Sequence, residues 1–403
     1  MSKPFLPYGR QSIDADDLAA VRDALTSDFL TSGPLVPRFE AEFAKVTGAR
    51  HAISCSNGTA ALHLAALAAG LGPGDRAVVP SITFLATANA VRMTGAEVVF
   101  ADVDAETGLM SAATFEAARA RAGGTVKAVL PVHLAGQCVE MAALVEAARR
   151  AGAVIIEDAC HAVGAAADTA AGSELVGACS HGGYATFSLH PVKTITTGEG
   201  GVVTTADDDA ARRLALLRNH GMSRAPEEFT ERDLAFDASG APNPWYYEMQ
   251  DVGWNYRLTD IQAALGLSQI AKLSRFLARR SSLRARYARE LASLAPLVSL
   301  SPTMPGSTPA WHLAVALIDF TGSRQTRAAV MRKLTEAGIG TQVHYIPVHR
   351  QPHYRRRYGA IDLPGAEAWY ARCLSLPLFP AMGDDDVTRV VETLGAVLKS
   401  VSH

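Results

Sequence analysis

The sequence predicts an α/β fold built on a mostly parallel sheet, with helices flanking the sheet and a smaller α/β domain at the C-terminus. In the first half of the 403 residues, short apolar segments alternate with segments of helical character. Strands that are continuously apolar are buried on both faces, and helices between them let successive strands run parallel. The segments that predict strands are residues 52–55, 77–80, 98–103, 126–132 and 154–157.

Helices are predicted between these strands. The segment 59–67 is rich in alanine and leucine, which are strong helix formers, and the Gly- and Pro-containing run 70–74 ends it. The segments 86–93 and 141–151 separate later strands in the same way. The chain therefore alternates strand and helix, as a doubly covered sheet requires.

The second half of the chain has a different character. The segment 222–251 is polar and contains several prolines, which predicts a long loop of functional or mobile character. The segment 258–282 has a helical pattern, and a strand at 314–318 with a helix at 327–337 indicates a small domain. We expect an N-terminal segment near the active site at 1–30, a large cofactor-binding domain at 31–257, an interdomain helix at 258–290 and a small C-terminal domain at 291–403.

Composition excludes several classes of protein. The net charge is −2, so the sequence lacks the excess of basic residues that is typical of nucleic-acid-binding proteins. The five cysteines are scattered, so neither a disulfide framework nor a metal site is expected. The sequence contains no apolar signal region and no long apolar stretch, so no membrane association is expected. We expect a cytoplasmic protein.

Polar residues follow the ends of several predicted strands. They include the run 57–59, Thr83 and Phe84, the run 158–161, and Ser188. Ligands of parallel sheets bind beyond the carboxyl ends of the strands. The pattern therefore predicts that these residues surround one site.

Lys193 and Asp158 carry the strongest chemical indication. Lys193 follows the run Phe187-Ser188 and precedes a glycine-rich segment, while Asp158 ends an apolar strand. A lysine amine can bond covalently to the aldehyde of pyridoxal 5'-phosphate, and an aspartate can keep the pyridine nitrogen of that cofactor protonated. As an alternative, Asp158 is an ordinary helix cap.

Other residues are candidates for the same cofactor. Gly58 and Thr59 open a helix whose amides can bind phosphate, and Ser188 offers a hydroxyl to the same group. Phe84 either stacks on the pyridine ring or packs in the core. His161 either bonds the phenolic oxygen of the cofactor, contacts its ring, or is a satisfied polar group.

Two later segments are less decisive. The segment 253–260 mixes aromatic residues with Asn255 and Arg257, so it is either a capped helix start or a source of a phosphate ligand. His344 and Tyr345 follow a predicted strand and either contact substrate or simply pack.

Together these segments resemble the sugar-nucleotide aminotransferases of the DegT/DnrJ type, which are fold-type I pyridoxal phosphate enzymes. The resemblance covers nearly the whole chain. It rests on the runs 57–62, 157–159, 187–193, 198–201, 218–221 and 255–266.

The resemblance implies roles for these residues. Lys193 would carry the cofactor, Asp158 would pair with its pyridine nitrogen, and Thr59 and Ser188 would hold its phosphate. Asn255 would reach the phosphate of the neighbouring subunit's cofactor, which implies a homodimer with shared active sites. Related dehydratases carry histidine where this chain has Lys193, so the resemblance favours transamination.

Within that family, the runs 158–164, 187–197 and 342–347 resemble the pseudaminic-acid branch. Such enzymes use L-glutamate to aminate C4 of a UDP-linked 4-keto-6-deoxy-N-acetylhexosamine, giving a 4-amino-4,6-dideoxy altrosamine type of product. Tyr8, Thr31 and Arg257 join His344 and Tyr345 as expected substrate contacts. The alternatives are a dTDP- or GDP-linked keto sugar, or a non-catalytic binding or regulatory protein on the same scaffold.

Overall fold

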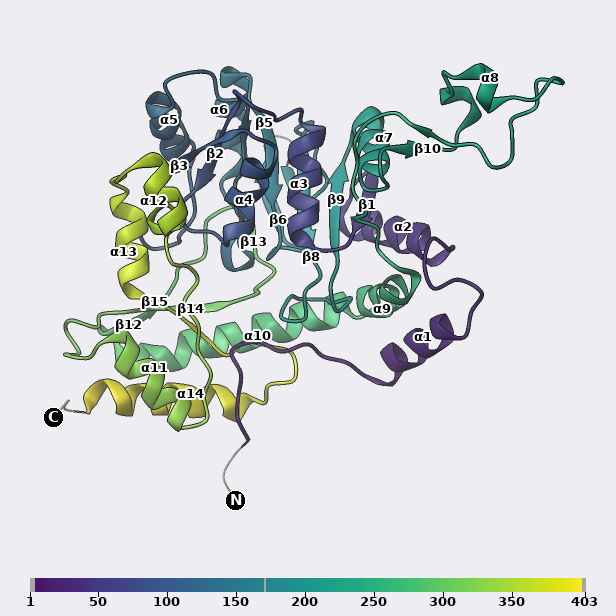
Figure 1. The fold of residues 1–403 in the computed structure, drawn as a ribbon. Helices are drawn as coiled ribbons and strands as arrows, with labels where there is room; N and C mark the ends of the chain where they lie inside the picture. The colour runs from purple at the N-terminus through teal and green to yellow at the C-terminus, as the bar shows by residue number, and fades with distance from the viewer. Residues whose placement is uncertain (1–3, 170–171, 401–403) are drawn as a thin grey trace.

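The computed structural model describes residues 4–169 and 172–400 (Figure 1). In its largest sheet, β9 runs antiparallel to both neighbours, and the other strands run parallel to one another. The predicted α/β fold with a mostly parallel sheet is therefore confirmed. The strands, in sheet order, are β1 (His51–Cys55), β9 (Gly201–Thr205), β8 (Tyr184–Ser188), β5 (Val154–Asp158), β4 (Ala128–Val129), β2 (Arg76–Pro80) and β3 (Glu97–Ala101).

Two features of this sheet differ from the prediction. Strands β8 and β9 lie outside the predicted segments, and β4 covers only two of the residues in the segment 126–132. Pro131 lacks the backbone N–H that a longer β4 would need for its ladder. Beyond that proline, Val132 still forms an isolated bridge with Asp158, so the chain stays beside β5.

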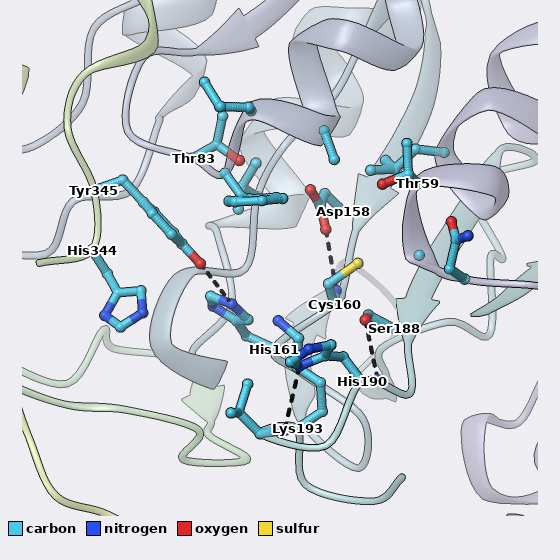
Figure 2. Close-up of a pocket in the computed structure, with 18 of the residues that line it drawn as sticks. Thr59, Thr83, Asp158, Cys160, His161, Ser188, His190, Lys193, His344 and Tyr345 are labelled. Atoms are coloured by element: carbon cyan, nitrogen blue, oxygen red, sulfur yellow. Dashed lines mark hydrogen bonds between the residues drawn. The ribbon is translucent and has the colours of Figure 1, made fainter. Parts of the chain in front are cut away.

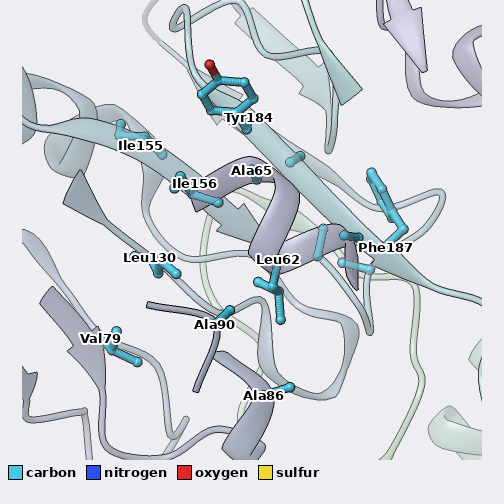
Figure 3. Packing of buried hydrophobic residues seen from close by; sticks show 14 of the residues in the cluster. Leu62, Ala65, Val79, Ala86, Ala90, Leu130, Ile155, Ile156, Tyr184 and Phe187 are labelled. Carbon is cyan, nitrogen blue, oxygen red and sulfur yellow. The ribbon is translucent and has the colours of Figure 1, made fainter. Parts of the chain in front are cut away.

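Helices pack along the strands of this sheet. Helix α3 contacts β8 and β9, and its alanine-rich sequence lets its backbone approach them closely. Figure 3 shows Leu62 and Ala65 of α3 in the main core, to which Phe187 of β8 also belongs. The helices around the sheet are α2 (Leu35–Thr47), α3 (Gly58–Ala68), α4 (Leu85–Met93), α5 (Ala112–Arg121), α6 (Met141–Ala151) and α7 (Asp208–Leu217).

A second, smaller core lies in the C-terminal part of the chain. It is formed between an antiparallel sheet and the helices that pack on it, and Leu6 of the N-terminal segment joins it. Its elements are β12 (Val298–Leu300), β14 (Ala314–Ile318), β15 (Cys373–Leu376), α10 (Leu273–Leu291), α11 (Arg327–Glu336) and α14 (Asp384–Lys399). Shorter elements nearby are η3 (Ala292–Leu294), η4 (Val348–Arg350), α12 (Pro352–Tyr358) and α13 (Pro364–Arg372).

The helix predicted over 258–290 is instead two helices, α9 (Asp260–Ile270) and α10, so that expectation of one continuous helix was wrong. The break falls at Lys272, whose amine is held by Asp14 and by Asp17 at 2.9 Å. Both acids belong to α1 (Ala15–Leu25) and its N-cap. The ion pairs therefore hold the N-terminal helix at the point where the chain changes direction.

The segment predicted as a long loop, 222–251, is a small folded arm that stands away from the sheet (Figure 1). It contains β10 (Met222–Ser223), η2 (Pro226–Glu228), α8 (Arg232–Ala235) and β11 (Glu248–Met249). The Glu248 carboxylate accepts hydrogen bonds from the amides of Thr230 and Glu231, which holds the arm together.

The remaining elements are η1 (Leu134–Gly136) and a sheet made of β13 (Ser307–Thr308), β6 (Ala166–Thr169) and β7 (Gly172–Leu175). Within the described residues, no helix combines the length and the apolar composition needed to cross a membrane.

Candidate active site

Most of the predicted site residues surround a cavity of about 800 Å³ at the carboxyl ends of the parallel strands. The loops after β1, β2, β5 and β8 form one side, and the segment 342–346 of the C-terminal part forms another. Figure 2 shows Asp158, Ser188 and Lys193 facing this cavity. Residues in separate parts of the sequence are therefore brought together where parallel sheets usually bind ligands.

Lys193 lies in the turn after β8, where its backbone amide donates to His190 at 2.9 Å. Its amine makes no hydrogen bond or ion pair to any residue that the structure describes. Burial lowers the pKa of this amine, and the nearby Cys160 and Asp158 only partly oppose that effect. A larger fraction of the amine is therefore neutral and nucleophilic than for an exposed lysine.

Asp158 is buried at the end of β5. Its Oδ2 accepts a hydrogen bond from the Thr87 hydroxyl at 2.6 Å, and its Oδ1 accepts one from the Cys160 amide at 3.2 Å. Turns follow Asp158, so it does not cap a helix. Among the described residues it forms no ion pair with lysine or arginine. A buried carboxylate without an ionic partner suits a cationic group in the cavity, such as a protonated pyridine nitrogen.

A phosphate cradle lies where α3 begins. The Asn57 side chain caps α3 by accepting from the Ala60 amide at 2.8 Å, which leaves the amides of Gly58 and Thr59 for a ligand. A Cβ added to Gly58 would lie 2.8 Å from the Ser188 Cβ, so only glycine allows this close approach. The cradle, the unpaired carboxylate and the free amine together fit pyridoxal phosphate.

Phe84 also lines the cavity. Its side chain is 56% exposed, which excludes the alternative that it packs in the core. Its ring centroid lies 6.1 Å from that of Tyr345. An aromatic face is therefore available to a planar ligand.

His161 uses both ring nitrogens within the protein. Its Nδ1 accepts from the Ala135 amide at 3.3 Å, and its Nε2 lies 3.1 Å from the Tyr345 hydroxyl (Figure 2). Since no ring nitrogen is left for a phenolic oxygen, the alternatives that remain are a contact through the ring and a satisfied polar group.

The N-terminal segment and the C-terminal part close the cavity. The Tyr8 ring lies 5.5 Å from the His344 ring, and the Nδ1 of His344 lies 2.7 Å from the Ser375 hydroxyl. Burial, with a smaller effect of the Lys193 charge, lowers the pKa of His344 to about 3. The imidazole of His344 is therefore neutral.

Three predicted residues do not line this cavity. Thr31 is exposed and forms an isolated bridge with Thr259, and the Arg257 guanidinium donates to Asn219 at 2.6 Å. Asn255 is exposed and bridges to Asn219 through its backbone. A ligand in this chain's own cavity does not reach these side chains.

Several lining residues escaped the sequence reasoning. Cys160 lies in the predicted run 158–161, but the run does not indicate which way the Cys160 side chain points. The His312 ring lies 4.4 Å from the His161 ring, yet its sequence surroundings give no indication of a site. Tyr256 lies in the segment 253–260, whose sequence does not single it out from its neighbours. Lining residues outside the predicted set also include His190, Glu199 and Gln342, whereas Asn57 and Thr83 line the cavity as predicted.

Comparison with known proteins agrees with this geometry. The model of the DegT/DnrJ/EryC1/StrS aminotransferase family matches residues 11–395. The chain is 38% identical over 398 residues to the spore coat polysaccharide biosynthesis protein SpsC of Bacillus subtilis (strain 168), covering 98% of this chain and 97% of that protein.

Solved structures with the same fold include DesV of S. venezuelae in complex with a ketimine intermediate, at 33% identity and a TM-score of 0.84, covering 99% of this chain and 100% of that one. They also include Helicobacter pylori PseC, an aminotransferase involved in the biosynthesis of pseudaminic acid. PseC matches at 26% identity and a TM-score of 0.86, covering 98% of this chain and 100% of that one.

Proposed function

The chain belongs to the DegT/DnrJ/EryC1/StrS aminotransferase family and is a pyridoxal-phosphate-dependent sugar aminotransferase, and on that premise we propose its substrates. The amino donor is L-glutamate. The acceptor is the C4 ketone of a UDP-linked 4-keto-6-deoxy-N-acetylhexosamine, as in pseudaminic acid biosynthesis. The observation that carries the reaction class is the cavity that holds the Lys193 amine, whose pKa is lowered by burial, together with the buried Asp158 carboxylate, which has no lysine or arginine partner among the described residues. The similarity to PseC supports this choice of sugar.

The residues have distinct tasks in this proposal. When bound, pyridoxal phosphate supplies an electron sink for the carbon that loses a proton. The amides of Gly58 and Thr59 and the Ser188 hydroxyl would hold its phosphate, and Asp158 would hold its ring nitrogen protonated. The Lys193 Nζ accepts the proton from Cα of the donor, and a positioned base of this kind contributes about 10²–10⁴-fold to the rate.

A second candidate acceptor is a TDP-linked keto sugar. DesI, whose structure was solved in the presence of its TDP-sugar product, is 32% identical to this chain, with a TM-score of 0.84. That identity exceeds the identity to PseC, and the nucleotide of the acceptor is what distinguishes the two candidates.

A substrate panel tests the choice of acceptor. The holoenzyme is mixed with L-glutamate and, separately, with UDP-, dTDP- and GDP-linked 4-keto sugars, and each nucleotide-linked amine is measured by mass spectrometry. We expect the UDP-linked N-acetylated sugar to give the highest kcat/KM. A preference for the dTDP-linked sugar would replace the proposed acceptor, and no transfer to any keto sugar would contradict the proposed function.

Charge in the cavity indicates that one chain does not complete the site. Among the described residues that line the cavity, Lys193 is the single lysine or arginine. A nucleoside diphosphate and the cofactor phosphate both need cations or further hydrogen-bond donors. We therefore propose a homodimer in which the second copy supplies them. Asn255 and the exposed aromatic residues of the arm, Trp245 and Tyr247, support this arrangement.

Complementation tests the shared site. Lys193→Ala and Asn255→Ala variants are expected to be weakly active alone. Co-expressed and assayed without separating the dimers, they should recover about a quarter of the wild-type activity, since random pairing gives half mixed dimers with one intact site each. If Asn255 acts within its own chain, the mixed dimers recover nothing, because neither site is then intact.

A further inference from the structure

Two segments far apart in the sequence meet at one hydrogen bond in the cavity. His161 follows β5, and Tyr345 belongs to the segment 342–346, yet the His161 Nε2 lies 3.1 Å from the Tyr345 hydroxyl. On its other side, the His161 Nδ1 faces the Ala135 amide at 3.3 Å. Ala135 is itself held in place, because its carbonyl accepts a hydrogen bond from the His312 amide at 2.9 Å. The imidazole is thus fixed at both nitrogens.

This arrangement determines where the imidazole proton lies. A backbone amide only donates, so the Nδ1 that faces Ala135 carries no proton and the Nε2 carries it. The ring is buried and lies 4.4 Å from the His312 ring. Burial and the Lys193 charge also keep the pKa of His161 well below its ordinary value, so the ring is neutral. His161 therefore donates to the Tyr345 oxygen.

The Tyr345 hydroxyl consequently has its own proton to donate elsewhere. No other described residue accepts from it, and Tyr345 lines the cavity. Its ring is held by aromatic neighbours, with the His344 ring at 4.8 Å and the Phe84 ring at 6.1 Å. The proton is therefore directed into the space where substrate binds.

We propose that Tyr345 donates a hydrogen bond to a carbonyl or hydroxyl oxygen of the sugar, and that His161 positions Tyr345 as a donor. A neutral phenol among uncharged rings suits a neutral sugar oxygen better than the carboxylates of glutamate. This inference rests on the proposed function, because it assumes that a keto sugar occupies the cavity. Tyr345 thereby determines which sugars are accepted, since a site built to bond an oxygen rejects analogues that lack it.

Substitutions test both members of the pair. Tyr345→Phe should raise KM for the keto sugar about tenfold, the effect of one net hydrogen bond, with a much smaller change in KM for L-glutamate. His161→Gln places an amide N–H near the Nε2 position, whereas His161→Asn reaches only the Nδ1 position. KM for the sugar should therefore rise less in His161→Gln than in His161→Asn. A rise in KM for L-glutamate instead would place Tyr345 against the amino donor and overturn the inference.

A spectroscopic test does not depend on activity. In protein with ¹⁵N-labelled histidine, the His161 resonance is identified by its loss in His161→Gln. It should show the neutral tautomer with the proton on Nε2 from pH 6 to 9. A proton on Nδ1, or titration in this range, would overturn the inference. If the substrate panel shows no sugar acceptor while the tautomer is as expected, the proposed function fails and the hydrogen-bond arrangement stands.

Discussion

Replacement of Lys193 by alanine is expected to abolish amino transfer. In the part of the chain that the structure describes, the Lys193 amine is the one lysine amine that lines the cavity, and the alanine variant would lose both the covalent attachment point of the cofactor and the proton-transferring base. Loss of a positioned base alone lowers a rate by about 10²–10⁴-fold, and loss of the nucleophile adds to that effect. The measurement is the rate at which the keto sugar is converted to its amine at saturating L-glutamate.

A surface lysine provides the matched control. Lys45 is exposed and pairs with Glu42 at 2.7 Å on α2, so Lys45→Ala should keep wild-type turnover and folding. Borohydride reduction of the wild-type holoenzyme, followed by peptide mass analysis, should locate the cofactor on Lys193. Undiminished turnover by Lys193→Ala, or a label on another lysine, would refute the assignment.

The sequence was sufficient to predict that residues such as Gly58, Asp158 and Lys193 share one cavity because these residues lie in short local patterns. The apolar strand ends in Asp158, and a helix begins at Gly58. Each pattern indicates where a side chain lies relative to the edge of the sheet. Parallel strands then bring those edges together without further information. The same reasoning predicted β1 to β5 of the main sheet, but not β8 and β9.

The contacts between distant segments could not be predicted in this way. The bond between Thr87 and Asp158, and that between His161 and Tyr345, depend on how α4 and the segment 342–346 pack against the sheet. Strand β9 was missed although its valines and threonines favour a strand. Thr204, for example, is fully buried and donates to the Gly177 carbonyl. A sequence pattern does not reveal such a partner.

Glu157, the neighbour of Asp158 on β5, serves the fold rather than the cavity. Successive residues of a strand point to opposite faces, so Glu157 points away from the side occupied by Asp158. It accepts from the Nε2 of His133 at 2.6 Å and from the Nε2 of His181 at 2.7 Å. Each of these rings accepts a backbone amide at its Nδ1, from Val139 and Gly183, which leaves its Nε2 proton for Glu157.

A metal ion is a weaker interpretation of this cluster. Ligand atoms of Glu157, Cys179 and His181 lie within 4.8 Å of one another. However, two ligands of one tetrahedral zinc stand about 3.3 Å apart, and the 2.7 Å between His181 and Glu157 is a hydrogen-bond length. The cluster is therefore a buried hydrogen-bond network.

Replacement of Glu157 by alanine is expected to lower the free energy of unfolding by about 3–5 kcal/mol, because it leaves two buried imidazole N–H groups without an acceptor. Glu146→Ala is the matched control. Glu146 is half exposed and pairs with Arg149 at 3.0 Å, so its loss should change stability by about 0–1 kcal/mol. Urea unfolding at pH 7, with the cofactor concentration held constant, measures both effects.

The pH dependence of the free energy of unfolding tests whether Glu157 stabilises the fold as an ionised carboxylate or only by filling space. Burial alone would raise the pKa of Glu157, but the two histidine donors outweigh it and lower the pKa to about 2 from an ordinary value of 4.5. The stability that the carboxylate contributes is therefore complete above pH 4.5 and is lost as pH falls toward 2. Glu157→Gln removes this titration, so its stability relative to the wild-type protein should improve as pH falls through that range. A constant difference between Glu157→Gln and wild type from pH 6 to pH 3 would show that folding does not lower the pKa of Glu157.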